Sequence, residues 1–243
     1  DVAPLLFMAM GVFAAAFIII SFFSIPEPHL QKSGAKKEKS AHSPWSFRHT
    51  VLGVIGIFIY VGVEIGIPGT LNFYLSDASE RGAGLLTNGA AIGGAIAAIY
   101  WLLMLVDRLV SSFISGKVSS RTQLIAVSAT AIAFILIAIF TPKTITISMP
   151  GYNVSEGFNT SQVPLSALFL VLCGLCTSVM WGGIFNLAVE GLGKYTAQAS
   201  GIFMMMVVGG GILPVLQQFI SDSVGYMASY WLIIAALAYL LFY

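Results

Sequence analysis

The stretch VLGVIGIFIYVGVEIGIPGTLNFYL, residues 51–75, is a long apolar run with one acidic residue, Glu64, near its centre. A helix of about 20 apolar residues crosses a bilayer, so this stretch is long enough to span one. An acidic side chain at the bilayer centre costs about 2.5–3.5 kcal/mol on insertion scales. We therefore expect Glu64 to face a protein interior or a wet cavity, where it acts on a ligand or a proton.

Polar residues recur along one face of this expected helix. Tyr60, Glu64, Pro68 and Asn72 are four residues apart, which places them near one face. Pro68 lacks a backbone donor and Gly69 lowers stiffness, so we expect the helix to bend or break there. Such irregular backbone is tolerated in membranes where it lines a cavity. The alternative is that Glu64 is a structural acid bonded to a neighbouring helix.

The composition identifies an integral membrane protein. Hydrophobic residues make up 58% of the 243 residues and charged residues only 9%. The mean hydropathy is +0.92. A soluble domain of this size does not carry so much apolar surface. We expect an all-α fold embedded in the lipid bilayer.

Apolar segments predict about seven transmembrane helices. Because the chain begins and ends inside apolar segments, we expect it to be a fragment of a longer protein. The domain prediction is a first span at 1–24, a basic loop at 25–47 and a bundle at 48–243. The expected spans are approximately residues 3–23, 51–75, 95–114, 124–140, 164–189, 199–220 and 227–243.

Successive loops alternate between many and few lysine and arginine residues. They concentrate in the loops at 25–50, 115–123 and 190–198. The opposite loops, at 77–94, 141–163 and 221–225, hold only Arg81 and Lys143. The positive-inside rule then places loop 25–50 in the cytoplasm and the polar loop 141–163 outside.

Further candidate residues lie in the third and fifth expected spans. Asp107 and Arg108 either form a local ion pair near the cytoplasmic surface or act as a conformational latch. Thr177 and Trp181 are one helical turn apart and share a face. A tryptophan beside hydroxyl groups suits a neutral polyol, although packing between helices explains it equally well. Asn186 is either a further polar ligand, a cap or an interhelical bond.

Small residues make the sixth expected span closely packed and bendable. It contains Gly201, the run Gly209 to Gly211, and Pro214. Glycine at these places permits close helix packing, and proline permits a bend. Gly210 and Pro214 are therefore candidate hinge residues for a conformational change, with simple packing as the alternative.

Motifs for enzymatic chemistry are missing from the sequence. Cys173 and Cys176 lie in an apolar segment without a nearby basic group to lower a thiol pKa. The three histidines form no metal-binding spacing, and no Walker or dinucleotide glycine pattern is present. We expect no enzyme activity, no cofactor, no metal site and no nucleic-acid partner.

With these residues in view, the sequence resembles the bacterial fucose, galactose and glucose proton symporters of the major facilitator superfamily. The stretches at 184–222 and 60–75 resemble that family most. VDR at 106–108 stands where the family more usually has V-G-R, and the tenth-helix pattern of the family differs around Thr177 and Trp181. The resemblance implies that the first span is the sixth helix of the parent, followed by its six-helix C-terminal half.

The resemblance also implies a function. The parent would carry a neutral hexose together with a proton across the bacterial inner membrane by alternating access. Its main coupling carboxylates would lie in the N-terminal half that is missing here, so Glu64 is expected to bind sugar rather than couple protons. The implied sugar-binding residues are Tyr60, Glu64, Asn72, Thr177, Trp181 and Asn186, and the implied gating residues are Pro68, Asp107, Arg108, Gly210 and Pro214.

Three alternatives remain open. The chain could belong to a major facilitator carrier for another small solute, but Arg108 is the one basic residue well inside a span, which disfavours anions. It could be a seven-helix receptor or photoreceptor, although residues 227–243 hold no lysine for retinal. A membrane-embedded enzyme would need a nucleophile–base pair or a metal cluster.

The topology gives a first test. A cysteine introduced at Ser155 should react with an impermeant maleimide added outside intact cells, because loop 141–163 is predicted to be external. Labelling only after the cytoplasmic side is exposed would contradict this topology.

Overall fold

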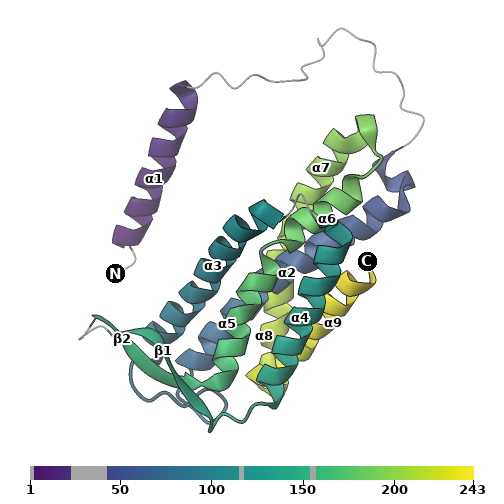
Figure 1. Cartoon of the computed structure of the whole chain (residues 1–243). Coiled ribbons are helices and arrows are strands. Elements are labelled where there is room, and N and C mark those ends of the chain that lie inside the picture. Colours follow the sequence, from purple (N-terminus) through teal and green to yellow (C-terminus); the bar gives the residue numbers. More distant parts are fainter. Residues whose placement is uncertain (1–2, 23–42, 115–117, 154–156) are drawn as a thin grey trace. The chain divides into compact units, whose positions relative to one another are not determined.

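The computed structural model describes residues 3–22, 43–114, 118–153 and 157–243 (Figure 1). The chain divides into two units, Asp1–Ala41 and His42–Tyr243. The elements are α1 (Ala3–Phe22), η1 (Pro44–Ser46), α2 (Arg48–Ser76), α3 (Gly89–Ile114), α4 (Ser120–Phe140), β1 (Thr146–Asn153), β2 (Gly157–Pro164), α5 (Leu165–Thr177), α6 (Met180–Val189), η2 (Gly193–Tyr195), α7 (Thr196–Met205), η3 (Met206–Val208), α8 (Gly209–Val224) and α9 (Tyr226–Phe242).

The helices agree with the expected membrane spans. Five helical segments are long and apolar enough to cross a membrane, and two shorter apolar helices, Leu6–Phe22 and Tyr226–Phe242, occupy the places of the first and last expected spans. The first unit contributes the single helix α1, and the second unit holds the bundle. The basic residues Lys32, Lys36, Lys37, Lys39 and Lys117, and also Ser155, lie outside the described residues.

Helix α2 is the centre of the second unit. It packs against α3, α5, α6, α8 and α9, and 61% of its most apolar window is buried, the highest share of any span. A helix that is apolar on all sides is expected in such a central position. The stretch with Glu64 is therefore surrounded by protein on most of its circumference.

Close packing around α2 depends on glycine. A Cβ added at Gly209 would overlap the backbone carbonyl of Phe58, so α8 approaches α2 at this point as only glycine allows. Next to it, a Cβ at Gly210 would lie 2.9 Å from Val61 Cγ1. Gly210 thus packs on α2, and this contact is compatible with the hinge role predicted for it.

Two expected spans are interrupted in the structure. The fifth divides at Ser178–Val179 into α5 and α6, and the sixth divides into α7 and α8 through the 3-10 turn η3. The interruption at η3 immediately precedes the run of glycines that the sequence marked as bendable. By contrast, α2 continues through Pro68 without a break, so a break, one of the two outcomes predicted there, does not occur, and the bend stays a prediction.

The expected polar loop at 141–163 contains a β-hairpin. Strands β1 and β2 are antiparallel, with Ile147 opposite Val163. Met149 and Val163 are buried and attach the hairpin to the bundle beside α3 and α5. The alternation of threonine and isoleucine at 144–147 is typical of a strand and could have predicted it. Figure 1 shows the hairpin at the end of the bundle where α4 ends and α5 begins.

The glycine contact is testable. Gly209→Ala should lower the stability of the detergent-solubilised protein by about 1–3 kcal/mol, because overpacking forces α2 and α8 apart. Gly211→Ala is the matched control, since a Cβ there meets nothing within 4 Å, and it should be neutral or stabilising by up to about 1 kcal/mol. Equal thermal unfolding midpoints for both variants would contradict the close contact.

Candidate polar site around Glu64

Three helices bring polar and aromatic side chains together at the middle of α2. Glu64 accepts a hydrogen bond from Tyr60 Oη at 2.8 Å through Oε1. Arg108, from α3, donates to the same oxygen at 3.4 Å and forms an ion pair with Glu64. Trp181, from α6, packs edge to face against Tyr60 with ring centroids 6.0 Å apart. The four residues form one cluster, the Glu64 site.

The Glu64 site is sheltered but not closed. Tyr60 is fully buried, the Glu64 side chain is 13% exposed and the Arg108 side chain 51% exposed. Glu64 is therefore mostly buried but not sealed, and its contact with a ligand stays a prediction. The charges of Glu64 and Arg108 cancel, so the site carries little net charge.

Acceptor groups of Glu64 remain open for a ligand. Both donors approach Oε1, and no residue in the described ranges donates to Oε2. Pro68 lies four residues after Glu64 and has no N–H, so the backbone carbonyl of Glu64 lacks its usual helical donor. The gating role predicted for Pro68 stays a prediction.

Arg108 and Asp107 have different partners. The predicted ion pair between them is not formed, because neighbouring residues on a helix point in different directions. Asp107 instead accepts hydrogen bonds from Ser111, at 3.1 Å, and from Ser178. Ser178 lies in the interruption between α5 and α6, so Asp107 ties α3 to this irregular backbone. The pairing of Glu64 with Arg108 was missed because it joins residues 44 positions apart.

The other predicted sugar-binding residues make no direct contact with Glu64, although Thr177 and Arg108 both reach the sulfur of Met104. Thr177 is fully buried, and its hydroxyl is 2.8 Å from Tyr100 Oη. The side chain of Asn72 packs against Gly93, near the start of α3. A Cβ added at Gly93 would lie only 2.7 Å from Asn72 Oδ1. Asn186 lies toward the end of α6, where it donates to Ser120 at 3.5 Å. Their predicted contact with sugar stays a prediction.

The predicted hinge residues of the sixth span lie on α8. Pro214 is half-buried inside the helix, five residues after Gly209. Together with η3 it leaves this span without a continuous run of α-helical bonds. That geometry is compatible with bending but does not test it.

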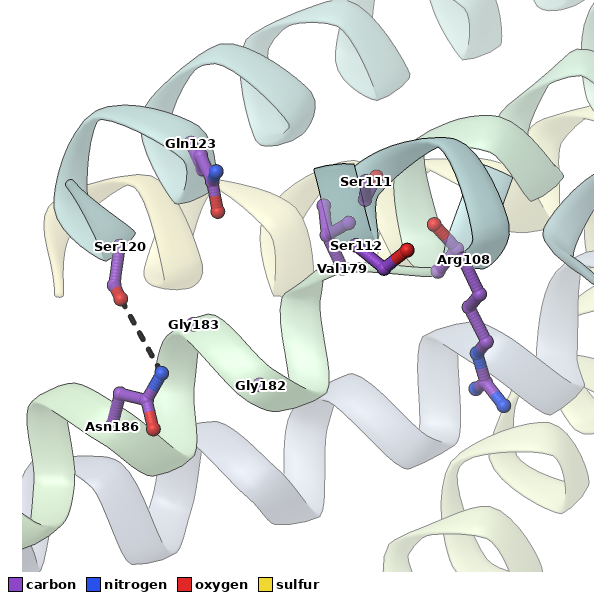
Figure 2. A pocket seen from close by; sticks show the side chains of 10 residues that line it. Arg108, Ser111, Ser112, Ser120, Gln123, Val179, Gly182, Gly183 and Asn186 are labelled. Atoms are coloured by element: carbon purple, nitrogen blue, oxygen red, sulfur yellow. Dashed lines mark hydrogen bonds between the residues drawn. The ribbon is translucent and has the colours of Figure 1, made fainter. Parts of the chain in front are cut away.

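A polar cavity lies beside the Glu64 site, among α3, α4 and α6 (Figure 2). Its volume is about 200 Å³, and its lining includes Arg108, Ser178, Gly182 and Asn186. Among the described residues, no three histidine, cysteine or acidic side chains are grouped to hold a metal ion.

Comparison with known proteins assigns the fold. The sequence profile of the Major Facilitator Superfamily matches residues 3–213. The chain therefore belongs to the major facilitator superfamily, as the resemblance predicted, and is a multi-pass membrane protein. A crystal structure of the major facilitator transporter FucP, in the outward conformation, aligns with a TM-score of 0.72 and 19% identity over 99% of this chain and 53% of that one.

Curated relatives are sugar transporters by name. The chain is 31% identical to a glucose/galactose transporter of Brucella abortus over 239 residues, covering 98% of this chain and 51% of the relative. It is 27% identical to a putative glucose/galactose transporter of Helicobacter pylori, covering 89% and 46%. It is 26% identical to the L-fucose-proton symporter of Escherichia coli, covering 73% and 35%. The chain spans about half the length of the curated relatives it matches, or less.

The buried contact between the Thr177 and Tyr100 hydroxyls can be tested as a structural hydrogen bond, the alternative to sugar binding by Thr177. Thr177→Val should cost about 1–3 kcal/mol of stability, because it leaves the buried Tyr100 hydroxyl without a partner. The double variant with Tyr100→Phe should recover most of that loss, since replacing both partners is nearly neutral. Additive losses in thermal unfolding would contradict a direct bond between the two hydroxyls.

Proposed function

We propose that this chain provides one wall of the substrate site in a proton-coupled transporter of a neutral hexose, of the glucose, galactose or fucose type. The observation that carries the proposal is the half-open Glu64 carboxylate at the centre of a span, compensated by Arg108 and placed beside an aromatic pair. The names of the relatives support a sugar as substrate.

The chemistry of the Glu64 site suits a sugar. Sugar hydroxyls donate hydrogen bonds, and the open Oε2 of Glu64 is an acceptor for them. Trp181 is half-buried, so part of its ring is available to the apolar face of a sugar ring. An ionic solute would disturb the balance of charge between Glu64 and Arg108, whereas a neutral one leaves it intact.

Alternating access would use the irregular parts of the bundle. Binding sites in such transporters lie near the midplane, at discontinuous helices, and two halves move around them. Here the interruption at Ser178–Val179 lies beside the cavity that Arg108 lines, and η3 packs on the same helix α2 that carries Glu64. The bond from Ser178 to Asp107 and the pair of Arg108 with Glu64 are the contacts that we propose to change between states. The coupling carboxylates would lie in the part of the transporter outside this chain.

Uptake by the full-length transporter in proteoliposomes tests the proposal. Glu64→Ala and Glu64→Gln should weaken hexose binding roughly 10- to 100-fold, the worth of one hydrogen bond to a charged group. Glu80→Gln removes an exposed acid at the end of the bundle and should leave uptake unchanged.

Two outcomes would contradict the proposal. Normal binding by Glu64→Ala would remove Glu64 from the site. Uptake by the unaltered protein that ignores an inward pH gradient would remove the proton as the coupling ion and leave sodium as the alternative.

A further inference from the structure

We propose that the polar cavity among α3, α4 and α6 is a second sugar subsite, distinct from the Glu64 site and visited by the sugar on its way across. The inference rests on the proposed function, because it takes the same neutral hexose as ligand. The cavity lies at the end of the bundle opposite the β-hairpin, the side that the positive-inside rule assigns to the cytoplasm.

The lining of the cavity matches a ligand with many hydroxyl groups. Hydroxyl and amide side chains line it, from three helices and from the interruption between α5 and α6. Such side chains can donate hydrogen bonds as well as accept them. Among the described residues that line it, Arg108 alone is charged, and it is already paired with Glu64. The hydroxyl and amide residues are Ser111, Ser112, Ser120, Gln123, Ser178 and Asn186.

The charge balance disfavours an anion. The carboxylate of Asp107 lies behind the wall, bonded to Ser111 and Ser178. Among the described lining residues, a phosphate group would meet this negative charge with no arginine except the one paired with Glu64. A neutral polyol needs no such compensation. Ser111 and Ser178 donate to Asp107 and Ser112 donates to Leu109 O, so these hydroxyls can still accept hydrogen bonds from it.

The cavity has room because glycine forms part of its wall. A Cβ at Gly182 would meet nothing within 4 Å, and one at Gly183 would make only ordinary contacts, the nearest at 3.6 Å. The cavity volume of about 200 Å³ is below the 300–1,000 Å³ typical of drug-sized ligands, which suits a compact ligand such as one sugar ring. In Figure 2 the bond from Asn186 to Ser120 crosses one end of the cavity. At 3.5 Å it is at the limit for a hydrogen bond and is readily exchanged for bonds to a ligand.

The cavity and the Glu64 site share a residue. Arg108 lines the cavity and donates to Glu64. A sugar that displaces Arg108 from Glu64, or leaves the Glu64 site past it, therefore reaches the hydroxyl-lined cavity next. Two weak sites in sequence allow a substrate to leave one set of hydrogen bonds only as it gains another.

Cysteine protection in the full-length transporter tests the subsite. Gly182→Cys places a thiol in the cavity without removing a polar side chain, while the native Cys173 and Cys176 are buried. The transported hexose should slow maleimide alkylation of this thiol at least about threefold. Gln198→Cys, on an exposed position of α7 outside the cavity lining, is the matched control and should react equally with and without sugar.

A second substitution added to Gly182→Cys distinguishes sugar binding in the cavity from sugar binding at the Glu64 site. Protection in Gly182→Cys should persist when Glu64→Ala is added, and should need at least about threefold more sugar when Asn186→Ala is added. Loss of protection with Glu64→Ala would mean that the thiol only reports occupancy or closure of the Glu64 site, which overturns the subsite. Protection by inorganic phosphate rather than by hexose would also overturn it.

The outcome for the subsite is distinguishable from that for the proposed function. Normal hexose uptake by Gly182→Cys without any protection would refute the subsite and leave the proposed function standing. Failure of the unaltered transporter to take up any hexose would refute the proposed function itself.

Discussion

The cost of placing a carboxylate in the middle of a membrane span is the constraint on which the rest of this structure depends. Glu64 is retained there because three helices surround it with compensating groups: a phenol on its own helix, a guanidinium from α3 and an indole from α6 next to the phenol. Helix α2 is accordingly the central helix of the second unit and packs against most of the other helices there.

Some spans of the bundle are continuous helices and others are interrupted. Helix α2 stays continuous through Pro68, whereas the fifth and sixth spans are interrupted at Ser178–Val179 and at η3. The proline in α2 withdraws a hydrogen bond from the Glu64 carbonyl without breaking the helix. The interruption at Ser178–Val179 lies beside the polar cavity, whereas the apolar turn η3 packs on α2. Irregular backbone in a membrane is tolerated where it lines a wet cavity or is buried in protein.

Asp107 and Arg108 illustrate how one helix serves two tasks. They are neighbours in sequence, yet Arg108 reaches the acid on α2 while Asp107 binds the interruption between α5 and α6. Helix α3 therefore links the Glu64 site to the least regular part of the bundle. A movement of α3 would change both sets of contacts together, which is how a local event at a ligand becomes a change of state.

The sequence by itself determined the class of protein and the approximate positions of the spans, and it placed an acidic residue, Glu64, inside one of them, because hydropathy and charge are local properties. It also placed Tyr60 correctly, since residues four apart meet on a helix. Only the tertiary structure decided that Arg108 pairs with Glu64 and not with Asp107, that Thr177 is buried against Tyr100, and that Asn72 and Asn186 lie away from Glu64. It also decided where helices are interrupted. These features arise from contacts between residues far apart in the chain. Helix periodicity predicts which residues share a face of one helix, but not which faces of different helices pack together.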